Sequence, residues 1–250
     1  MLELFTAAFW DQYGALIWKE TLNTLTMVGV STVFAYLLGL PLGVLLVITQ
    51  EHGIRPHKLV NQVLGWIINV GRSLPFIILM ISIMDFTKLI VGTKIGVKGA
   101  IVPLVVSAAP FIARMVETSL TEVDAGVVEA AQSMGASPLQ IVWKVYLPEA
   151  MPSLVLGGSI SVITILAYTA IAGAVGAGGL GDLAIRYGYN RRVDSMLLVT
   201  VVLLIVLVQV IQSIFSRVSN RIDKRVSGDA RKGVIAQLRK LMPIYPNKFR

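Results

Sequence analysis

The amino-acid sequence predicts an all-α membrane protein that crosses the bilayer five times. Its 250 residues have a mean hydropathy of +0.76, and 55% of them are hydrophobic while only 14% are charged. Soluble domains usually have about 25% charged residues. Several nearly uncharged stretches are also long enough, at about 1.5 Å per helical residue, to span a hydrocarbon core of about 30 Å. The short alternating segments typical of membrane β-barrels are not visible in the sequence.

Five apolar segments are the predicted spans. In chain order they are Leu22–Thr49, Leu59–Phe86, Gly99–Leu120, Ser153–Val175 and Ser195–Phe215. The first two exceed the ~20 residues needed to cross, so a tilt, a kink or an extension beyond the bilayer is expected. The fourth contains small residues such as Gly157 and Gly158, which permit close helix contact, and is expected to be central. The fifth is the most uniformly aliphatic and is expected to be peripheral.

Charged residues within the apolar segments are few. Arg72 lies well inside the second segment, next to Pro75, where a charge costs about 2.5–3.5 kcal/mol on insertion scales. We expect it to anchor a helix break or form an ion pair, in preference to contacting a substrate. Arg114 and Glu117 are spaced i,i+3 near the end of the third segment and are predicted to form a local ion pair.

The distribution of basic residues predicts the orientation. Ten of the 22 Lys and Arg residues follow residue 216, and cytoplasmic segments are enriched in these residues. A cytoplasmic C-terminus and five crossings place the N-terminus outside and the 114–149 stretch inside. Because this pattern accounts for the net charge of +8, no nucleic-acid partner is expected.

A helix–glycine–helix element is predicted between the third and fourth spans. Val128–Met134 is expected to form a short helix, which Gly135 can end because glycine tolerates the left-handed conformation. Ser137-Pro138 suits the start of a second helix. Leu139, Val142 and Tyr146 then recur at helical spacing and are expected to form one apolar face of this helix. Pro148 is expected to close it.

This element resembles the EAA loop of ABC importer permeases, whose pattern is E-A-A, three residues, G, nine residues and I-x-L-P. Glu129-Ala130-Ala131, Gly135 and Leu147-Pro148 match it, and Val145 replaces the isoleucine. The resemblance implies a cytoplasmic coupling helix that docks in a groove on a separate ATPase. The residues to which it assigns this coupling are Val128, Glu129, Ala130, Ala131, Met134, Gly135, Leu147 and Pro148.

Further stretches resemble the permeases of bacterial methionine importers: residues 72–77, 111–117 and 172–181, the last followed by 187–189. The similarity covers roughly residues 20–226. It implies a homodimer in the bacterial cytoplasmic (inner) membrane, with two ABC ATPase subunits and an extracytoplasmic, lipid-anchored binding protein. ATP is then bound and hydrolysed by the partner, and this chain is expected to bind no cofactor and to be no enzyme. Residues 1–226 are the predicted transmembrane domain, and 227–250 a basic cytoplasmic tail.

The glycine-rich run Gly176-Ala177-Gly178-Gly179-Leu180-Gly181 follows the fourth span. A nucleotide loop is disfavoured, because the run follows a membrane helix and lacks the Lys-Ser/Thr of a P-loop. We predict a tight turn or close packing at the outer mouth, where glycine allows unusual dihedral angles. A share in the gate is a second interpretation.

The candidate residues for the translocation pathway or gate lie on the third and fourth spans. They are Ser107, Ala108, Tyr168, Thr169, Ile171 and Gly173, with ordinary helix packing as the alternative for each. A methionine side chain is apolar, so the pathway needs no fixed charge cluster. No metal site is predicted, because His52 and His57 lack a third ligand at useful spacing.

Other functions remain as alternatives. An importer permease for another amino acid or small solute would share the EAA loop, and uptake competition separates it from a methionine permease. A secondary transporter predicts inverted repeats and intramembrane ion ligands, and neither is visible. A membrane enzyme is disfavoured because the spans contain no paired carboxylates or Ser/His/Asp constellation.

The tail combines basic residues with an apolar stripe at near-helical spacing. The stripe consists of Val234, Ile235, Leu238, Leu241 and Met242. This pattern predicts a surface helix on anionic lipid, with a regulatory contact to the ATPase as the alternative.

Overall fold

The computed structural model describes residues 7–222, which form helices joined by turns and contain no strand. The long helices are α1 (Ala7–Thr49), α5 (Gly96–Thr121), α9 (Met151–Gly173) and α11 (Asp194–Ile222). The shorter elements, of which η2 and η3 are π-helical, are α2 (Lys58–Ser73), α3 (Phe76–Ser82), α4 (Met84–Val91), α6 (Ala125–Ser133), α7 (Pro138–Ile141), η2 (Val142–Tyr146), α8 (Leu147–Glu149), α10 (Gly179–Leu183) and η3 (Ala184–Tyr189). The predicted tail, residues 227–250, lies outside the described residues.

The described helices confirm an all-α protein with four or five candidate membrane spans. The four long helices are each long and apolar enough to cross a membrane, and α2 with α3 makes a fifth candidate span, bent by 100°. α1 begins at Ala7, well before the predicted apolar start at Leu22. Residues 7–21 are thus also helical, although they include charged side chains. Its 43 residues would measure about 65 Å, so α1 extends beyond a bilayer core.

The break between α2 and α3 is the kink expected in the second span. Pro75 directly precedes α3. A proline inside a continuous helix lacks the N–H for a backbone hydrogen bond and its ring clashes with the preceding turn, so the helix is interrupted here. Just before the break, a Cβ on Gly71 would lie 2.8 Å from the Pro110 ring of α5, so the two helices touch there. Arg72 lies exposed at this break and forms no ion pair within residues 7–222. The break is thus the setting that we expected for this arginine.

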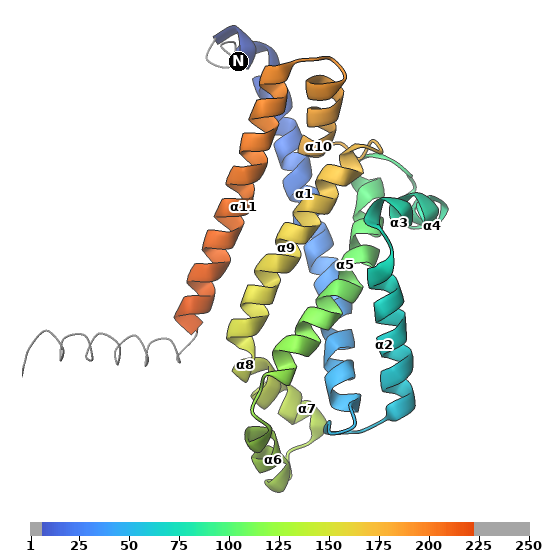
Figure 1. Ribbon diagram of the computed structural model, residues 1–250, viewed down its shortest axis with the longest axis vertical. Coiled ribbons are helices and arrows are strands. Elements are labelled where there is room, and N and C mark those ends of the chain that lie inside the picture. Colours follow the sequence, from blue (N-terminus) through green and yellow to red (C-terminus); the bar gives the residue numbers. More distant parts are fainter. Residues whose placement is uncertain (1–6, 223–250) are drawn as a thin grey trace, which may run out of the picture.

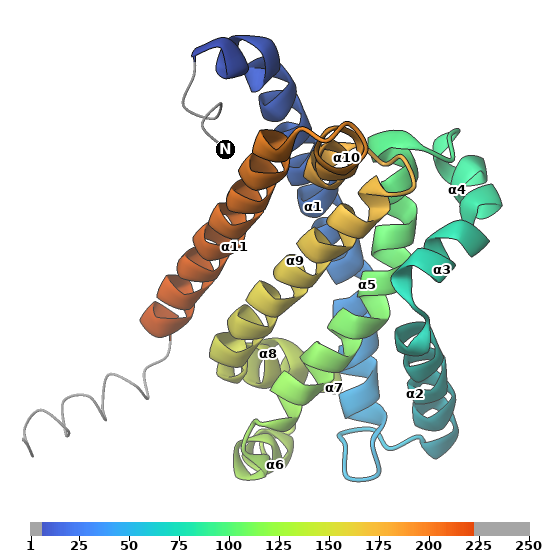
Figure 2. The ribbon, with the colours of Figure 1, turned by 45° about the horizontal axis from the view of Figure 1, so that its top comes forward.

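α1 and α5 pack closely through two glycines on α1. A Cβ on Gly39 would lie 2.8 Å from the carbonyl oxygen of Ala109, and one on Gly43 would lie 2.5 Å from that of Ala113. Glycines four residues apart face the same way and let two membrane helices approach closely. In Figures 1 and 2, α1 runs behind α5 through the middle of the subunit.

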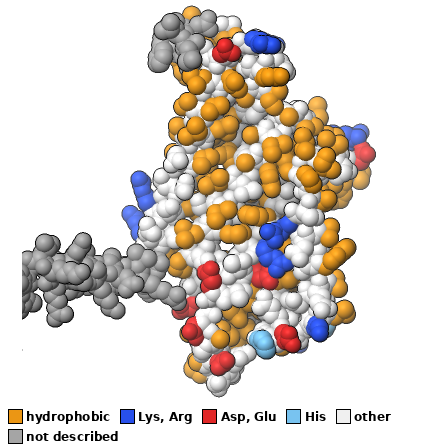
Figure 3. Space-filling model, viewed as in Figure 1, with side chains coloured by type: hydrophobic (Ala, Val, Ile, Leu, Met, Phe, Trp, Pro, Cys, Tyr) orange, Lys and Arg blue, Asp and Glu red, His pale blue; other side chains and the backbone are white. Residues whose placement is uncertain are grey.

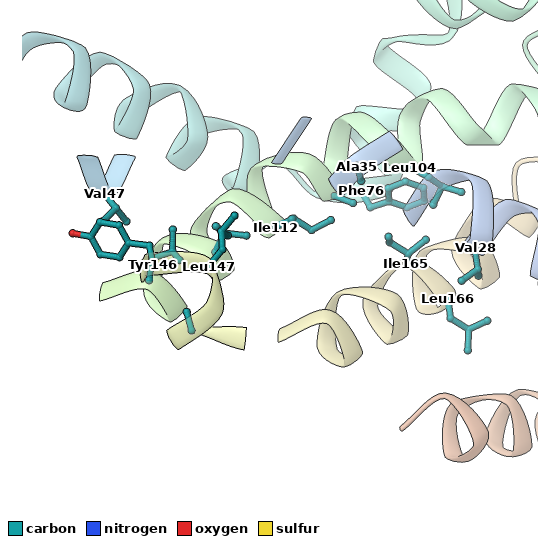
Figure 4. Close-up of a cluster of buried hydrophobic side chains, with 14 of the residues drawn as sticks. Val28, Ala35, Val47, Phe76, Leu104, Ile112, Tyr146, Leu147, Ile165 and Leu166 are labelled. Carbon is teal, nitrogen blue, oxygen red and sulfur yellow. The ribbon is translucent and has the colours of Figure 1, made fainter. Parts of the chain in front are cut away.

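The apolar core forms where α1, α3, α5 and α9 meet. Figure 4 shows this cluster, whose labelled members include Val28, Ala35, Phe76, Leu104, Ile112, Ile165 and Leu166. α5 is the most enclosed of the four long helices, whereas we expected the fourth predicted span, α9, to be central. α9 lies between α5 and α11 and leaves one face uncovered (Figure 1). α11 is peripheral, as predicted, and exposes most of its aliphatic side chains.

The subunit has two chemically different ends. The loop at residues 50–57 and the elements α6, α7 and α8 lie at one end, and the start of α1 lies with α10 at the other (Figures 1 and 2). Most acidic side chains on the face drawn in Figure 3 gather toward the first end, while hydrophobic side chains spread over the rest. We call these the coupling end and the outer end, after the topology predicted from the sequence.

Candidate functional site

The helix–glycine–helix element projects at the coupling end (Figure 1). Asp124 begins α6 by accepting a hydrogen bond from the N–H of Gly126 at 2.7 Å. Gly135 follows the helix with φ = +77°, and the N–H of Ala136 donates back to the carbonyl of Ala131 at 3.1 Å. This is the predicted glycine end of the helix, although α6 begins three residues before Val128.

The second helix begins as predicted but continues further. Ser137 and Gln140 form a reciprocal capping box, with Pro138 in the first turn. α7 then runs through η2 into α8, which ends at Glu149, so the prediction that Pro148 closes the helix is wrong. The N–H of Leu147 donates to the carbonyl of Val142, five residues back. This wide turn breaks the regular hydrogen-bond ladder just before Pro148, which has no N–H to contribute.

The three apolar side chains that were expected to share a face differ in their exposure. Val142 and Tyr146 are buried, whereas Leu139 is 69% exposed. The prediction that all three lie on one apolar face therefore does not hold for Leu139, which lies in α7, before the π-helical residues begin. Leu139 instead faces away from the subunit.

The predicted coupling residues divide into two groups. Val128, Ala131 and Leu147 are buried and fix the element to its own subunit, whereas Glu129, Ala130, Met134, Gly135 and Pro148 are exposed. Two further apolar side chains of the element are exposed and were not among the predicted coupling residues, Val127 at 44% exposure and Leu139. We call Val127, Ala130, Met134 and Leu139 the docking face, after the role predicted for this element. It is a small apolar surface without cover in the subunit.

A polar network joins three of the spans toward the coupling end. Arg114 and Glu117 form the predicted ion pair at 2.6 Å. Gln50, after the end of α1, donates to Glu117 at 3.2 Å, and Arg114 donates to Asn69 of α2 at 2.7 Å. Because Arg114 and Glu117 both lie on α5, these contacts join the end of α1, α2 and α5.

The predicted pathway residues have different surroundings. Ser107, Ala108, Thr169 and Gly173 are buried within the subunit, and the Thr169 hydroxyl donates to the carbonyl of Leu166. Tyr168 is half-buried and stacks on Phe76 of α3, with ring centroids 4.6 Å apart. Ile171 is 41% exposed. Of the six, only Tyr168 and Ile171 have substantial exposed surface in a single subunit.

Ile171 belongs to an uncovered stripe on α9 that the sequence analysis missed. The stripe comprises Leu156, Ile160, Ala167 and Ile171, which are exposed and lie four or seven residues apart, on one side of the helix. Its spacing was visible in the sequence, but α9 is apolar on all sides. Periodicity alone therefore could not separate this face from the buried ones.

The glycine-rich run forms a tight turn at the outer end, as predicted. We call residues 174–181 the outer turn. Gly176, Gly178 and Gly179 have φ near +80°, a conformation that side chains with a Cβ rarely adopt. A Cβ on Gly181 would lie 2.3 Å from the carbonyl oxygen of Ala170, so the turn packs directly on α9.

The helix after the turn carries an ion pair between Asp182 and Arg186, at 2.9 Å. Burial raises the pKa of the Asp182 carboxyl, while Arg186 lowers it and the nearby Glu20 carboxylate raises it. The carboxyl is thus shielded from water and close to a second acid.

The comparisons with known proteins agree with this architecture. Residues 36–228 match the family described as binding-protein-dependent transport system inner membrane component. The probable D-methionine transport system permease protein MetI of Vibrio cholerae is 51% identical over 221 residues, which cover 88% of this chain and 98% of that protein. The methionine import system permease protein MetP of Bacillus subtilis is 44% identical over 209 residues, covering 84% and 94%.

Solved structures give the same result. A structure of the MetNI methionine ABC transporter in an inward-facing conformation has a TM-score of 0.84 at 44% identity, covering 86% of this chain and 99% of that one. An amino acid ABC transporter crystallised with histidines shares the fold, with a TM-score of 0.69 at 20% identity and coverage of 86% and 98%. Because the family match spans more than half of the sequence and the relatives align over nearly their whole length, this chain belongs to the family of binding-protein-dependent transport system inner membrane components.

Proposed function

We propose that this chain is the membrane permease subunit of an ATP-driven importer that carries methionine into the bacterial cytoplasm. The observation that supports it most is the projecting α6–α7 element, whose docking face has no cover in the subunit. A helical element with a small apolar surface suits a groove on a second protein. The relatives named as methionine permeases and the likeness to a methionine ABC transporter favour methionine over another solute.

The motor in this proposal is a cytoplasmic ABC ATPase, two copies of which bind the permease and hydrolyse the ATP. The coupling end then faces the cytoplasm, as do the C-terminal end of α11 and the basic tail. The ATPase contacts the exposed residues of the element, while Val128, Ala131 and Leu147 transmit the motion into the subunit. Alternating access follows because nucleotide state favours one arrangement of the ATPase pair, and with it one arrangement of the permease.

A second copy of the chain completes the pathway. The stripe on α9 leaves Leu156, Ile160 and Ile171 exposed, and a twofold pair would bring such stripes together near its axis. Tyr168 and Ile171, at the edge and on the face of this stripe, are the pathway candidates best placed to meet a passing apolar side chain. An extracytoplasmic, lipid-anchored binding protein delivers the amino acid to the outer end.

Reconstitution tests this function directly. Proteoliposomes that contain the full chain, its ATPase, binding protein outside and ATP inside should accumulate labelled methionine. Omitting the ATPase, or using a hydrolysis-deficient ATPase, should reduce uptake to background. An excess of unlabelled methionine should compete, whereas other amino acids should compete weakly. Uptake without the ATPase would favour a secondary transporter, and competition by another amino acid alone would change the substrate.

Ala130→Trp tests the docking face. The side chain is exposed, so tryptophan should leave the subunit folded but hold the ATPase groove away from α6. We expect co-purification with the ATPase to be lost and methionine uptake to fall at least tenfold. Ala125→Trp is the matched control, since Ala125 is also exposed on α6 but lies about 140° around the helix. Equal behaviour of the two variants would refute the assignment of this face.

A further inference from the structure

Glu20 is a buried carboxylate on α1, exposed by only 5%, to which the sequence analysis gave no role. Its Oε2 atom accepts a hydrogen bond from the N–H of Gly179 at 2.7 Å and a second from Nδ2 of Asn23 at 3.0 Å. Burying a charge is costly unless hydrogen bonds compensate for the lost water. The hydrogen bond from Gly179 therefore compensates for part of the cost of burying the Glu20 carboxylate.

The Gly179 contact caps a helix from a distant part of the chain. The first N–H groups of a helix lack partners within it and have a partial positive charge. Gly178, the residue that precedes α10, has no side chain to supply a cap. Glu20 supplies one acceptor, and the Thr24 hydroxyl supplies another to the N–H of Leu180 at 2.8 Å. α1 thus caps α10 across 159 residues of sequence.

The capped segment is the end of the outer turn, which two other spans also hold. The N–H of Gly96, the first residue of α5, donates to the carbonyl of Gly176 at 2.9 Å. Gly173 at the end of α9 packs on the backbone of Gly181, where a Cβ would lie 2.5 Å from its carbonyl carbon. The outer turn therefore connects the outer parts of α1, α5 and α9 in one subunit.

We propose that Glu20 is a positioning residue for transport: it fixes the outer turn so that the outer parts of α1, α5 and α9 move as one body. This inference rests on the proposed importer function. Opening toward the outside then takes place between the two copies of the permease, because the outer turn within each copy keeps its conformation. Without the Glu20 cap, the outer turn deforms when the coupling end moves, so the movement does not reach the outer parts of the spans. ATP is then hydrolysed without opening the permease toward the outside.

The ratio of methionine transported to ATP hydrolysed, measured with the reconstituted full complex, tests this role. Glu20→Ala should lower the ratio at least fivefold while co-purification with the ATPase is kept, because the docking face lies at the opposite end. Glu20→Gln keeps an acceptor oxygen for Gly179 and should stay within twofold of the unmodified complex. Asp11→Ala removes an exposed acid from the same helix and should change nothing.

A purely structural role for Glu20 predicts a different result. Fewer complexes would assemble, and transport and hydrolysis would fall together with an unchanged ratio, which would overturn the proposal. Equal defects in Glu20→Gln and Glu20→Ala would overturn it as well. If Glu20→Ala does not assemble, Glu20→Gln is compared with a Glu20→Leu variant, and an unchanged ratio in the latter would overturn the proposal. Thr24→Val, which removes the acceptor for Leu180 and the hydroxyl's bond to the Glu20 carbonyl, should lower the ratio less than loss of the Glu20 carboxylate. An unmodified complex that transports no methionine would instead refute the proposed function.

Discussion

Replacing Gly43 by leucine is expected to abolish accumulation of the folded subunit. A Cβ at this position would lie 2.5 Å from the carbonyl oxygen of Ala113 and 2.7 Å from the Cβ of Val116, both on α5. Neither neighbour is the flexible end of a side chain, so α1 and α5 would have to separate. Overpacking a close contact typically costs about 1–3 kcal/mol, and a leucine against backbone should be at or above that range. Immunoblots of membranes and thermal unfolding in detergent measure the effect.

Gly29→Leu is the matched control for this substitution. Gly29 lies on the same helix and is exposed, and a Cβ added there would have no neighbouring atom within 4 Å. Leucine there should leave both the membrane level and the unfolding temperature close to those of the unmodified chain. If Gly43→Leu and Gly29→Leu accumulate equally, the close α1–α5 contact is not a determinant of stability.

Gly135→Val is expected to uncouple the permease from its ATPase and to lower methionine uptake at least tenfold. Gly135 has φ = +77° and no atom near its added Cβ, so the cost is conformational and not steric crowding. The left-handed conformation costs about 1–2 kcal/mol for ordinary residues and more for β-branched ones. Since about 1.4 kcal/mol is a factor of ten in an equilibrium, valine should displace α7 from α6 in most molecules. Co-purification and uptake are the measurements.

Gly135→Asn separates this conformational effect from the mere presence of a side chain. Asparagine tolerates the left-handed region, so this variant should keep most of its ATPase binding and uptake. The level of the subunit in the membrane should be unchanged in both variants, because the turn lies outside the packed spans. Uptake by Gly135→Val at the level of Gly135→Asn would contradict the assigned geometry.

The local sequence was sufficient to predict the spans and most of the coupling element. Segment length and apolarity determine whether a helix can cross a membrane, and these properties do not depend on distant residues. The capping box at Ser137 and the glycine end at Gly135 were predictable for the same reason, since caps involve residues three or four apart. The π-helical turn at Val142–Tyr146 was not predictable by this logic, and neither was the exposure of Leu139, which was expected to share a face with Val142 and Tyr146.

Contacts between distant segments could be found only in the tertiary structure. Glu20 was visible as an acid just before an apolar run, but its partner is the N–H of Gly179, 159 residues away. The uncovered stripe on α9 depends on where α5 and α11 pack, and no periodicity indicates it in a helix that is apolar all round. The sequence by itself thus determined the helical class, the spans and the family motif, because these depend on neighbouring residues. The docking face, the outer turn and the central position of α5 were decided by packing, which brings together groups with no fixed relation along the chain.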